Sequence, residues 1–301
     1  MPAAAVPYGS LPMPAPLIAV DAPSLLYRAF YALPKSITGP DGTPTNALLG
    51  TANLVLQAVE RHEPRAVVLC FGAEAAPYRV ALYDGYHADR PEMPAELQPQ
   101  WDDAPAFFGA FGWPVLRDDD VEADDLLGSL ATLETEAGGR ALLFTGDRDM
   151  FQCVGERVAV LFPGGGKGEP EVIGPEEVER RYGVAPGQVP DFIALRGDPS
   201  DGLPGARGIG EKTARDLLRA HGTLDALIAA AGDVRSDLRP RVRAALTDGR
   251  DALHAYREIA TLRHVDVARP PDGPTDWAAA AAAARERGMN RLAERLAAHA
   301  A

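Results

Sequence analysis

The sequence predicts an α/β protein built around a mostly parallel sheet. Three short apolar runs are typical of buried strands, and helical patterns separate them: residues 17–20, 66–71 and 140–144. Strands that alternate with helices usually pair in parallel, and helices then cover both faces of the sheet. Asp21 directly follows the first run, and Asp147 and Asp149 follow the third. Because ligands bind beyond the carboxyl ends of the strands in such sheets, this edge is the predicted site.

Helical patterns connect and follow these strands. One helix is predicted after Asp21 and a second over residues 45–62, where apolar side chains recur on one side. Residues 151–162 predict a short helix and a further strand. A helix over residues 175–182 is closed by Gly183, at the position where glycine commonly ends a helix.

The last third of the chain is predicted to be helical. Helical patterns continue after Ala214, and the alanine- and arginine-rich residues 229–301 predict a helical cap. We therefore predict a tail at residues 1–16, a sheet domain over residues 17–185 and a helical region over residues 186–301. Four arginines of the cap are either duplex-phosphate contacts or part of a solvated face: Arg235, Arg239, Arg241 and Arg243.

Composition bounds the location and the partners. No apolar run approaches the ~20 residues that a membrane helix needs. Residues 1–16 are rich in proline and alanine without a basic flank, so we interpret them as a disordered tail. Cys70 and Cys153 have no metal-binding spacing, which favours reduced thiols in the cytoplasm. The net charge of −13 argues against non-specific nucleic-acid binding, which favours a basic surface.

Two irregular segments interrupt the pattern. Residues 77–105 contain several prolines and little periodicity, which indicates either a functional segment or a mobile surface insertion. Residues 164–168, Gly-Gly-Gly-Lys-Gly, are similar to a phosphate-binding loop. They lack its full pattern and no clear helix follows, so a hairpin or a flexible turn is predicted there.

Acidic residues gather before a predicted helix that begins near residue 123. Residues 118–120 fit helix capping and a favourable interaction with the helix dipole. Glu122 and Asp125 lie three residues apart and share one helix face, with Asp124 beside them. Carboxylates this close together cost stability unless a cation, such as a shared Mg²⁺ or Mn²⁺, compensates them.

Residues 197–213 combine carboxylates with a glycine-rich turn. Asp198 and Asp201 lie three residues apart, and Gly205, Gly208 and Gly210 lead into another predicted helix. Such a turn exposes backbone N–H groups at the positive end of the helix dipole, where they can bind phosphate. The neighbouring acids indicate a cation held close to that phosphate.

The candidate metal ligands are all carboxylates: Asp21, Glu122, Asp124, Asp125, Asp147, Asp149, Asp198 and Asp201. No histidine or cysteine spacing suits zinc. Hard oxygen ligands select Mg²⁺ or Mn²⁺, and two such ions can activate a water and stabilise the leaving oxygen of a phosphodiester. A single acid near a strand end is usually a helix cap, but four spaced clusters are poorly explained by capping alone.

The Gly-Asp-Pro-Ser-Asp segment at residues 197–201, its glycine-rich continuation and the Glu-Ala-Asp-Asp run at residues 122–125 resemble the signature of the 5′-nuclease family. This family includes the flap endonucleases and the 5′-nuclease domain of bacterial DNA polymerase I. The resemblance extends from about Leu17 to Ala230. Since the chain ends soon afterwards, a free-standing bacterial 5′-nuclease is expected.

The resemblance implies a PIN-like (Rossmann-like) sheet domain, an arch at about residues 77–105 and a helix–two-turn–helix at about residues 190–221. It implies two or more Mg²⁺ or Mn²⁺ ions, with K⁺ at the helix–two-turn–helix. The implied activity is 5′→3′ exonuclease and flap endonuclease action in DNA replication and repair. The expected substrates are DNA with 5′ ends, flaps or junctions and RNA/DNA primer hybrids, bound by a nucleoid-associated monomer without membrane contact.

The resemblance also implies roles for cations and for the glycine-rich turn. Arg28 and Arg79 match family arginines near the scissile phosphate and at the base of the arch. The DNA-binding residues implied in the same way are Tyr86, His87, Arg90, Gly205, Gly208, Gly210, Lys212 and Thr213. Such contacts position a duplex without reading its sequence, so recognition of DNA structure is expected.

Three positions depart from the family pattern. Gly72 stands where the family has a metal-ligand aspartate, and the nearby Glu74 is either a substitute or a surface acid. His87 replaces the lysine that usually follows Gly-Tyr in the arch, and Gly202 replaces an asparagine. These departures leave open a second function, a weakened or inactive paralogue that binds branched DNA. A third, a PIN-type ribonuclease, is disfavoured because such domains lack the glycine-rich duplex-binding segment.

Overall fold

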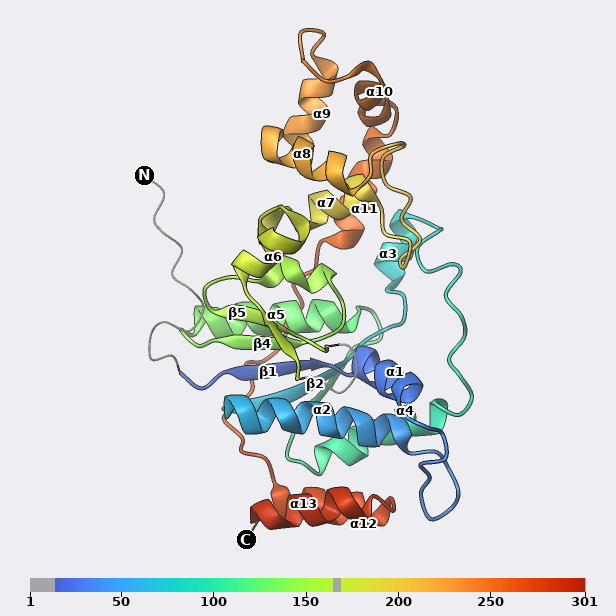
Figure 1. The fold of residues 1–301 in the computed structure, drawn as a ribbon, viewed down its shortest axis with the longest axis vertical. Helices are drawn as coiled ribbons and strands as arrows, with labels where there is room; N and C mark the ends of the chain where they lie inside the picture. The colour runs from blue at the N-terminus through green and yellow to red at the C-terminus, as the bar shows by residue number, and fades with distance from the viewer. Residues whose placement is uncertain (1–13, 165–168, 301) are drawn as a thin grey trace.

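The computed structural model describes residues 14–164 and 169–300, and within them six strands form one sheet (Figure 1). The strand order is β3-β2-β1-β4-β5-β6, and every described pair is parallel except β5 with β6. The predicted mostly parallel sheet is thereby confirmed. The strands are β1 (Leu17–Asp21), β2 (Ala66–Phe71), β3 (Val115–Arg117), β4 (Ala141–Phe144), β5 (Val158–Phe162) and β6 (Glu171–Ile173).

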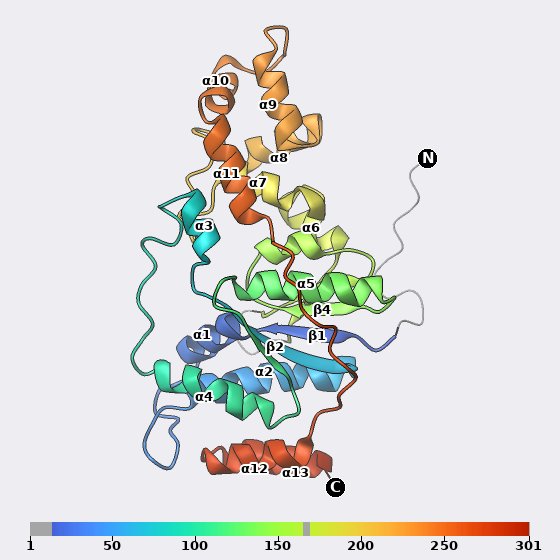
Figure 2. The same ribbon diagram turned by 180° about the vertical axis from the view of Figure 1, so that it is seen from behind.

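Helices surround the sheet and extend the molecule beyond it at both ends of its long axis (Figure 1, Figure 2). The α-helices are α1 (Ala22–Ala32), α2 (Asn46–His62), α3 (Pro77–Leu82), α4 (Gln98–Gly109), α5 (Ala123–Glu136), α6 (Pro175–Tyr182), α7 (Val189–Arg196), α8 (Glu211–His221), α9 (Leu224–Gly232), α10 (Pro240–Asp248), α11 (Arg250–Ala260), α12 (Trp277–Glu286) and α13 (Asn290–Ala300). Two short 3₁₀ helices are η1 (Asp149–Cys153) and η2 (Pro186–Gln188).

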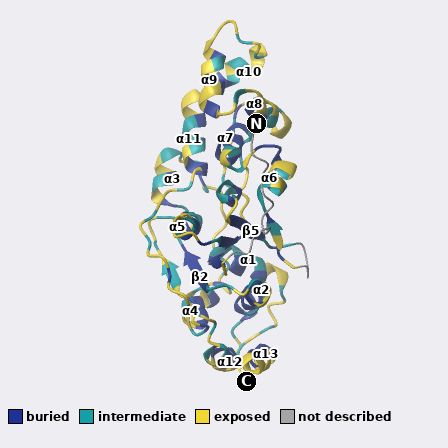
Figure 3. Ribbon diagram, turned by 90° about the vertical axis from the view of Figure 1, so that its left-hand side faces the viewer, coloured by how far each residue is buried: buried dark blue, intermediate teal, exposed yellow. Residues whose placement is uncertain are grey.

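The central strands are buried on both faces, as a parallel sheet covered by helices requires (Figure 3). Ile18 and Val20 pack in the core formed with α1, α2 and α4, whereas Leu17 and Ala19 pack in the core that contains α5. In the register of β1 with β2, Asp21 lies beside Cys70 at the carboxyl end of the strands. The sheet therefore delivers the first candidate acid to the predicted edge.

The sequence pattern missed short elements. Strand β3 has only three half-buried or exposed residues, so no apolar run marks it. The segment 77–105 is more ordered than its composition indicates, because it contains α3 and the first part of α4. Both helices begin with proline in their first turn, where a missing N–H costs nothing. The glycine-rich residues 165–168 and tail residues 1–13 lie outside the described residues.

The predicted helix–two-turn–helix is formed by α7, residues 197–210 and α8. Gly205 and Gly208 both have positive φ, +69° and +78°, a conformation that other L-residues rarely adopt. A hydrogen bond from Ala206 N to Leu195 O ties the turn to α7, and the main chains of Asp198 and Leu203 bond to each other within the turn. These bonds hold the glycine-rich turn close to the acids that precede it.

The C-terminal part is not one helical cap as predicted. Residues 261–276 are non-helical, and we call them the strap; they contain Pro270, Pro271 and Pro274, which disfavour helix. The strap leaves α11, passes α5 and ends at α12 on the far side of the sheet (Figure 2). Along the way Val265 N donates to Ser129 Oγ at 2.8 Å. The strap thus connects the helical region with the opposite end of the molecule.

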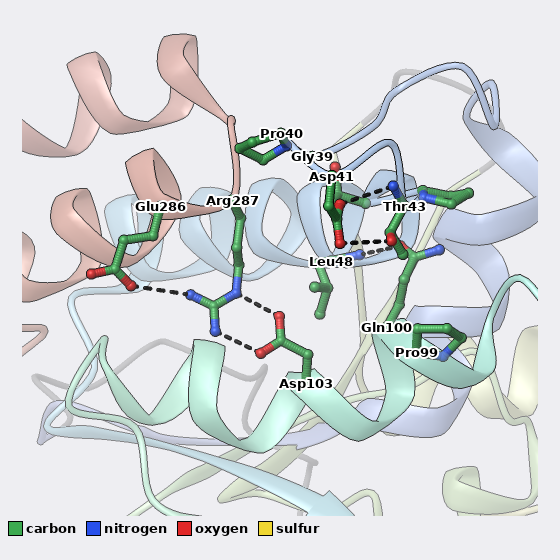
Figure 4. Close-up of a pocket in the computed structure, with 12 residues that line it drawn as sticks. Gly39, Pro40, Asp41, Thr43, Leu48, Pro99, Gln100, Asp103, Glu286 and Arg287 are labelled. Carbon is green, nitrogen blue, oxygen red and sulfur yellow. Dashed lines mark hydrogen bonds and ion pairs between the residues drawn. The ribbon is translucent and has the colours of Figure 1, made fainter.

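Helix α12 packs against α4, and α13 packs against α12, at the lower end of the molecule in Figure 1. Arg287 donates to both carboxylate oxygens of Asp103 on α4, at 2.5 and 2.6 Å (Figure 4). Trp113 Nε1 donates to Thr275 Oγ1 at 3.0 Å. A hollow of about 440 Å³ lies beside Arg287, but it contains none of the predicted site residues.

Glu134 at the end of α5 is the buried counter-ion that fixes the strap. Its side chain is 1% exposed, and it accepts from Arg65 and from Arg269 of the strap, at 2.9 and 3.0 Å from Arg269. We expect Glu134→Gln to lower the free energy of unfolding by about 3–5 kcal/mol, because breaking a buried pair leaves a charge uncompensated. Urea denaturation at neutral pH measures this loss.

The matched control is Asp119→Asn, which breaks the exposed pair with Arg117. It should change the free energy of unfolding by less than about 1 kcal/mol. Equal losses in the two variants would show that the Glu134 network does not stabilise the strap.

Candidate functional site

A cleft of about 1080 Å³ opens at the carboxyl ends of β1 and β4. Seven of the eight predicted acids line it: Asp21, Glu122, Asp124, Asp147, Asp149, Asp198 and Asp201. They come from four segments: the end of β1, the start of α5, the segment after β4 and the turn after α7. The parallel sheet brings the first three segments to one edge, and the helix–two-turn–helix adds the fourth.

Local hydrogen bonds orient the acids that follow the strands. Asp21 caps α1 by accepting from Ser24 N at 3.0 Å, and it accepts from Thr145 Oγ1 at 2.6 Å. Asp147 Oδ1 accepts from Asp149 N at 2.8 Å. These contacts use main-chain or hydroxyl donors, so they fix the carboxylates without neutralising them.

Two further acids are held by their own segments. Glu122 is the N-cap residue of α5 and forms a reciprocal capping box with Asp125. Asp198 accepts from Ser200 N at 2.9 Å and from Arg196 Nη2 at 2.8 Å. The cap of α5 is therefore Glu122 and not one of residues 118–120, for which capping was predicted, and Glu122 also lines the cleft.

The cleft is electrostatically unfavourable for so many carboxylates. Burial raises the pKa of Asp21 to about 6, although hydrogen bonds from Thr145 and Ser24 lower it. Burial, followed by repulsion from Asp124, raises the pKa of Asp147, and burial and the charge of Asp147 raise that of Asp149. Burial also raises the pKa of Glu122, in opposition to the nearby guanidinium of Arg79. A cation in the cleft would reverse these shifts.

Arg79, one of the two predicted catalytic arginines, is a counter-charge inside this acidic cluster. Its side chain is 3% exposed and lies 2.6 Å from Glu122 Oε2. It also lies 3.2 Å from both Asp124 Oδ2 and Asp125 Oδ1. Because it comes from α3, it links the base of the predicted arch to the acids of α5.

The other predicted cations lie differently. Arg28 donates to the carbonyl of Gly164 and is not among the residues that line the cleft. Arg90 lines the cleft and donates to Glu74 O at 2.7 Å. His87 bonds Asp201 Oδ1 through Nε2 at 3.2 Å and the Glu74 carbonyl through Nδ1 at 2.8 Å. His87 therefore holds the predicted arch against the turn that carries Asp201, and Arg90 ties the arch to the segment after β2.

Tyr86, which we expected to contact DNA, is buried and turned inward. It is 4% exposed, and its hydroxyl donates to Glu122 at 3.0 and 3.1 Å. This tyrosine therefore supports a carboxylate instead of offering a surface to a nucleic acid. The packing of its ring on His87, with centroids 4.0 Å apart, is what turns it away from solvent.

Asp125 is the one predicted acid that does not line the cleft. It is fully buried, and it accepts hydrogen bonds from Tyr78, Arg79, Glu122 and Arg263. Tyr78 and Arg263 were not predicted as functional residues. Tyr78 is adjacent to the predicted Arg79, but Arg263 lies outside every motif, so only the fold could reveal this contact.

The donor set fits hard divalent cations, because carboxylate oxygens are the ligands that Mg²⁺ and Mn²⁺ prefer. The raised pKa values of Asp21 and Asp147 indicate unneutralised negative charge in the cleft, although Arg79 pairs with Glu122 and Arg196 pairs with Asp198. Across the described ranges, no three acidic, histidine or cysteine side chains lie close enough to form a preassembled metal cluster.

Close packing explains why residue 72 is a glycine. A Cβ atom at this position would lie 2.3 Å from Ala123 N and 2.4 Å from the carbonyl carbon of Glu122. The start of α5 therefore occupies the space that a side chain would need. Glu74, the alternative acid, lines the cleft, is exposed and accepts from Tyr27 Oη at 3.1 Å.

Gly202 is likewise required by close packing. Its added Cβ would lie 2.4 Å from the carbonyl oxygen of Gly85, and its φ is +75°. Next to it, His87 N donates to Asp201 O at 3.1 Å. The glycine thus lets the predicted arch contact the turn that carries Asp198 and Asp201.

A second hollow lies beside the glycine-rich turn. It measures about 580 Å³ and is lined by Gly205, Arg207 and Arg241, together with Asp248. Arg241 of α10 packs on Gly208, since an added Cβ would lie 3.1 Å from its Nη2. Among the described residues, neither Arg207 nor Arg241 forms an ion pair. This surface offers guanidinium groups next to exposed backbone.

Comparison with known families agrees with this arrangement. Residues 16–183 match the description "5′-3′ exonuclease, N-terminal resolvase-like domain", and residues 184–273 match "5′-3′ exonuclease, C-terminal SAM fold". The chain therefore belongs to the 5′-3′ exonuclease family.

No helix in the described part of the chain is long and apolar enough to cross a membrane.

Curated relatives include free-standing and larger proteins. A 5′-3′ exonuclease of Mycobacterium tuberculosis is 36% identical over 283 residues, which cover 86% of this chain and 88% of the relative. One of Streptomyces coelicolor is 36% identical, with 92% and 97% covered. DNA polymerase I of Mycobacterium bovis is 38% identical over 85% of this chain, which spans only 28% of that polymerase.

Solved structures share the fold. The flap endonuclease of bacteriophage T5, in a pseudo-enzyme–product complex with DNA and metal ions, has a TM-score of 0.68 at 16% identity. The match covers 93% of this chain and 97% of that one. The catalytic core of Rad2 in complex with DNA substrate has a TM-score of 0.64 at 13% identity, with 94% and 90% covered.

We expect Gly72→Asp to destabilise the protein and not to increase metal binding. Overpacking of a filled site typically costs about 1–3 kcal/mol, because the backbone must shift. Thermal unfolding and Mn²⁺ titration measure both effects. Gly155→Asp is the control, since nothing lies within 4 Å of its Cβ position. Tighter Mn²⁺ binding by Gly72→Asp would instead show that the position can accept a ligand.

Without divalent metal, the protein should lose stability as pH rises. A carboxyl group whose pKa is raised on folding stabilises the fold below its unfolded pKa and loses this contribution as pH rises through its folded pKa. In the folded protein the pKa of Asp21 is about 6 and that of Asp147 is about 8, whereas the ordinary pKa of an aspartate is 3.8. The stability should therefore be lost between about pH 4 and pH 8. Melting temperature in EDTA should fall over this range, less so in Asp147→Asn, and Mg²⁺ should restore it. A wild-type profile that matches the variant would contradict this account.

Proposed function

We propose that this protein is a divalent-metal-dependent 5′-nuclease that hydrolyses phosphodiesters in DNA with 5′ ends, flaps or junctions. The observation that carries the proposal is the cleft in which seven carboxylates face one space beside a helix–two-turn–helix. Mg²⁺ or Mn²⁺, when bound, supplies water activation and stabilisation of the leaving oxygen. The proposed ligands are the seven predicted acids among the residues that line the cleft.

The cations around the cleft orient the reacting strand in this proposal. Arg90 stands at the wall of the cleft and supplies a positive charge that a phosphate can approach. Arg79 balances Glu122 and Asp124 from within, which limits their mutual repulsion. His87, where the family has lysine, contributes through its bonds to Asp201 and Glu74 by holding the arch in place.

The glycine-rich turn is the proposed duplex-binding surface. Gly205, Gly208 and Gly210 offer backbone groups, and Lys212 and Thr213 lie in the first turn of α8, where the helix dipole favours phosphate. Arg241 extends this surface from α10. The same turn is the proposed K⁺ site. Contacts of this kind recognise the duplex backbone, so replication or repair intermediates are the expected substrates, RNA/DNA primer hybrids included.

One observation keeps a second function in view. Gly72 removes one carboxylate of the family pattern, and its surroundings have closed over the space. A paralogue that binds branched DNA without cutting it would retain the duplex surface. The first function is favoured because the seven cleft acids remain, far more than a binding protein requires, and because crowding them costs stability.

Cleavage of a 5′-labelled flap duplex with Mg²⁺ or Mn²⁺ tests the proposal. We expect cleavage near the junction and a loss of at least about 100-fold in Asp147→Asn, because that carboxylate is a proposed ligand. Asp119→Asn, an exposed acid outside the cleft, should cleave normally. If the wild type binds the flap duplex but does not cleave it with either metal, the nuclease proposal is refuted and the DNA-binding paralogue is favoured.

Arg241→Ala should weaken duplex binding in a salt-dependent way. Each lost phosphate contact reduces the slope of log K against log salt by about 0.9, because one fewer counterion is released. Fluorescence anisotropy with the Asp147→Asn background in Ca²⁺ measures this without cleavage. Arg235→Ala is the matched control, since that exposed arginine is paired with Asp233. An unchanged slope in Arg241→Ala would remove α10 from the duplex surface.

A further inference from the structure

The carboxylate of Asp125 is fully occupied by protein donors. Oδ1 accepts from Tyr78 Oη at 3.1 Å, Arg79 Nη2 at 3.2 Å and Arg263 N at 2.8 Å. Oδ2 accepts from Tyr78 Oη at 2.9 Å and Glu122 N at 3.2 Å. These contacts come from four donors, since the Tyr78 hydroxyl has one proton, and a carboxylate has about four lone-pair sites, so no position is left free for a metal.

Arg263 of the strap contacts both Tyr78 and Asp125. Its guanidinium carbon lies 3.4 Å from the centroid of the Tyr78 ring, which is cation–π contact. Its main-chain N–H is the donor to Asp125. One strap residue thus holds the buried carboxylate with its backbone and the aromatic ring above it with its side chain.

Tyr78, Asp125 and Arg263 come from three different parts of the molecule and contact one another. Tyr78 belongs to α3 at the base of the predicted arch, and Asp125 lies in the first turn of α5. Arg263 lies just after α11, which packs on α7 of the helix–two-turn–helix. Figure 2 shows the strap descending from α11 past α5. We name Tyr78, Asp125 and Arg263 the strap–arch junction.

Neighbouring contacts reinforce the junction. Gln152 of η1 donates to Ala260 O at 2.8 Å and accepts from Leu262 N at 3.2 Å. The rings of Tyr83 and Tyr256 meet edge to face with centroids 5.3 Å apart, which connects the end of α3 to α11. The start of the strap is therefore fixed to the segment that carries Asp149 as well as to the arch.

We propose that the strap–arch junction is a positioning group that sets the arch base and the α5 acids relative to the duplex-binding helices, and that Asp125 is not a metal ligand. This inference rests on the proposed nuclease function. Two residues of the junction are sequence neighbours of residues in the acidic cluster: Tyr78 precedes Arg79, and Asp125 follows Asp124. A small shift of α3 would displace Arg79 from Glu122 and Asp124, and misplacement by about 1 Å can cost about 100-fold in rate.

The substitutions that test the junction remove its contacts selectively. Arg263→Ala removes the cation–π contact and the exposed 3.8 Å ion pair with Glu258, which contributes little, but keeps the main-chain bond. Tyr78→Phe removes the hydroxyl but keeps the ring. Asp125→Asn neutralises the carboxylate. Asp124→Asn is the comparison for a proposed ligand. His264→Ala is the matched strap control, because it is exposed and forms no contact among the described residues.

The measurements are Mn²⁺ affinity by calorimetry, melting temperature, and kcat and KM on the flap duplex. We expect Arg263→Ala and Tyr78→Phe to lower kcat about 10-fold or more, with Mn²⁺ affinity within about 2-fold of wild type. Asp125→Asn should also keep Mn²⁺ affinity, whereas Asp124→Asn should weaken it. Arg263→Lys should recover part of kcat because a lysine also makes a cation–π contact, and Arg263→Met should not.

Three results would overturn the inference. Loss of Mn²⁺ affinity in Asp125→Asn equal to that in Asp124→Asn would make Asp125 a ligand. An unchanged kcat in both Arg263→Ala and Tyr78→Phe would remove the positioning role. If Arg263→Lys and Arg263→Met both lower the melting temperature and have the same kcat, the junction only stabilises the fold and does not position the site. Wild-type protein that binds Mn²⁺ but does not cleave would refute the nuclease and the positioning role, whereas the calorimetry would still decide whether Asp125 is a ligand.

Discussion

Repulsion among carboxylates gathered at one edge of the sheet is the constraint on which the rest of this structure depends. Burial and neighbouring charges raise the pKa values of Asp21, Asp147 and Asp149, so the folded protein holds these groups at a cost. The sheet, the α5 capping box and the helix–two-turn–helix all bring acids to this edge. An arrangement this unfavourable without a cation is explained by the binding of one.

Arg79 shows how the protein manages that charge from within. It is buried between Glu122, Asp124 and Asp125 and reaches them from the base of the arch. Charge balance therefore couples the arch to the acid-bearing helix. The strap adds a second coupling on the other side of Asp125, and the contacts of His87 and Gly202 add a third at the turn after α7.

Much of the fold could be predicted because β1, β2 and β4 are short apolar runs, and because acids lie at or just after the ends of β1 and β4. The boundaries of β2 agree with the prediction, and β1 and β4 differ from it by one residue. Strand β3 and the strap could not be predicted, since neither has periodicity and both are defined by pairing with distant segments. The acids were recognisable from motifs, but the burial of Asp125 and Tyr86 and the inward course of Arg79 depend on tertiary packing. Gly72 is similar: its sequence shows a missing ligand, and only the backbone of residues 122–123 shows why no side chain fits.

We propose that the cleft carboxylates hold divalent cations and that Asp125 does not. The most direct measurement is the anomalous difference density of Mn²⁺ in crystals of the protein. The account predicts peaks within ligand distance of cleft acids such as Asp124 and Asp147, with Asp125 still bonded to Tyr78 and Arg263. A Mn²⁺ ion on the Asp125 carboxylate, or no ion in the cleft at saturating metal, would contradict it.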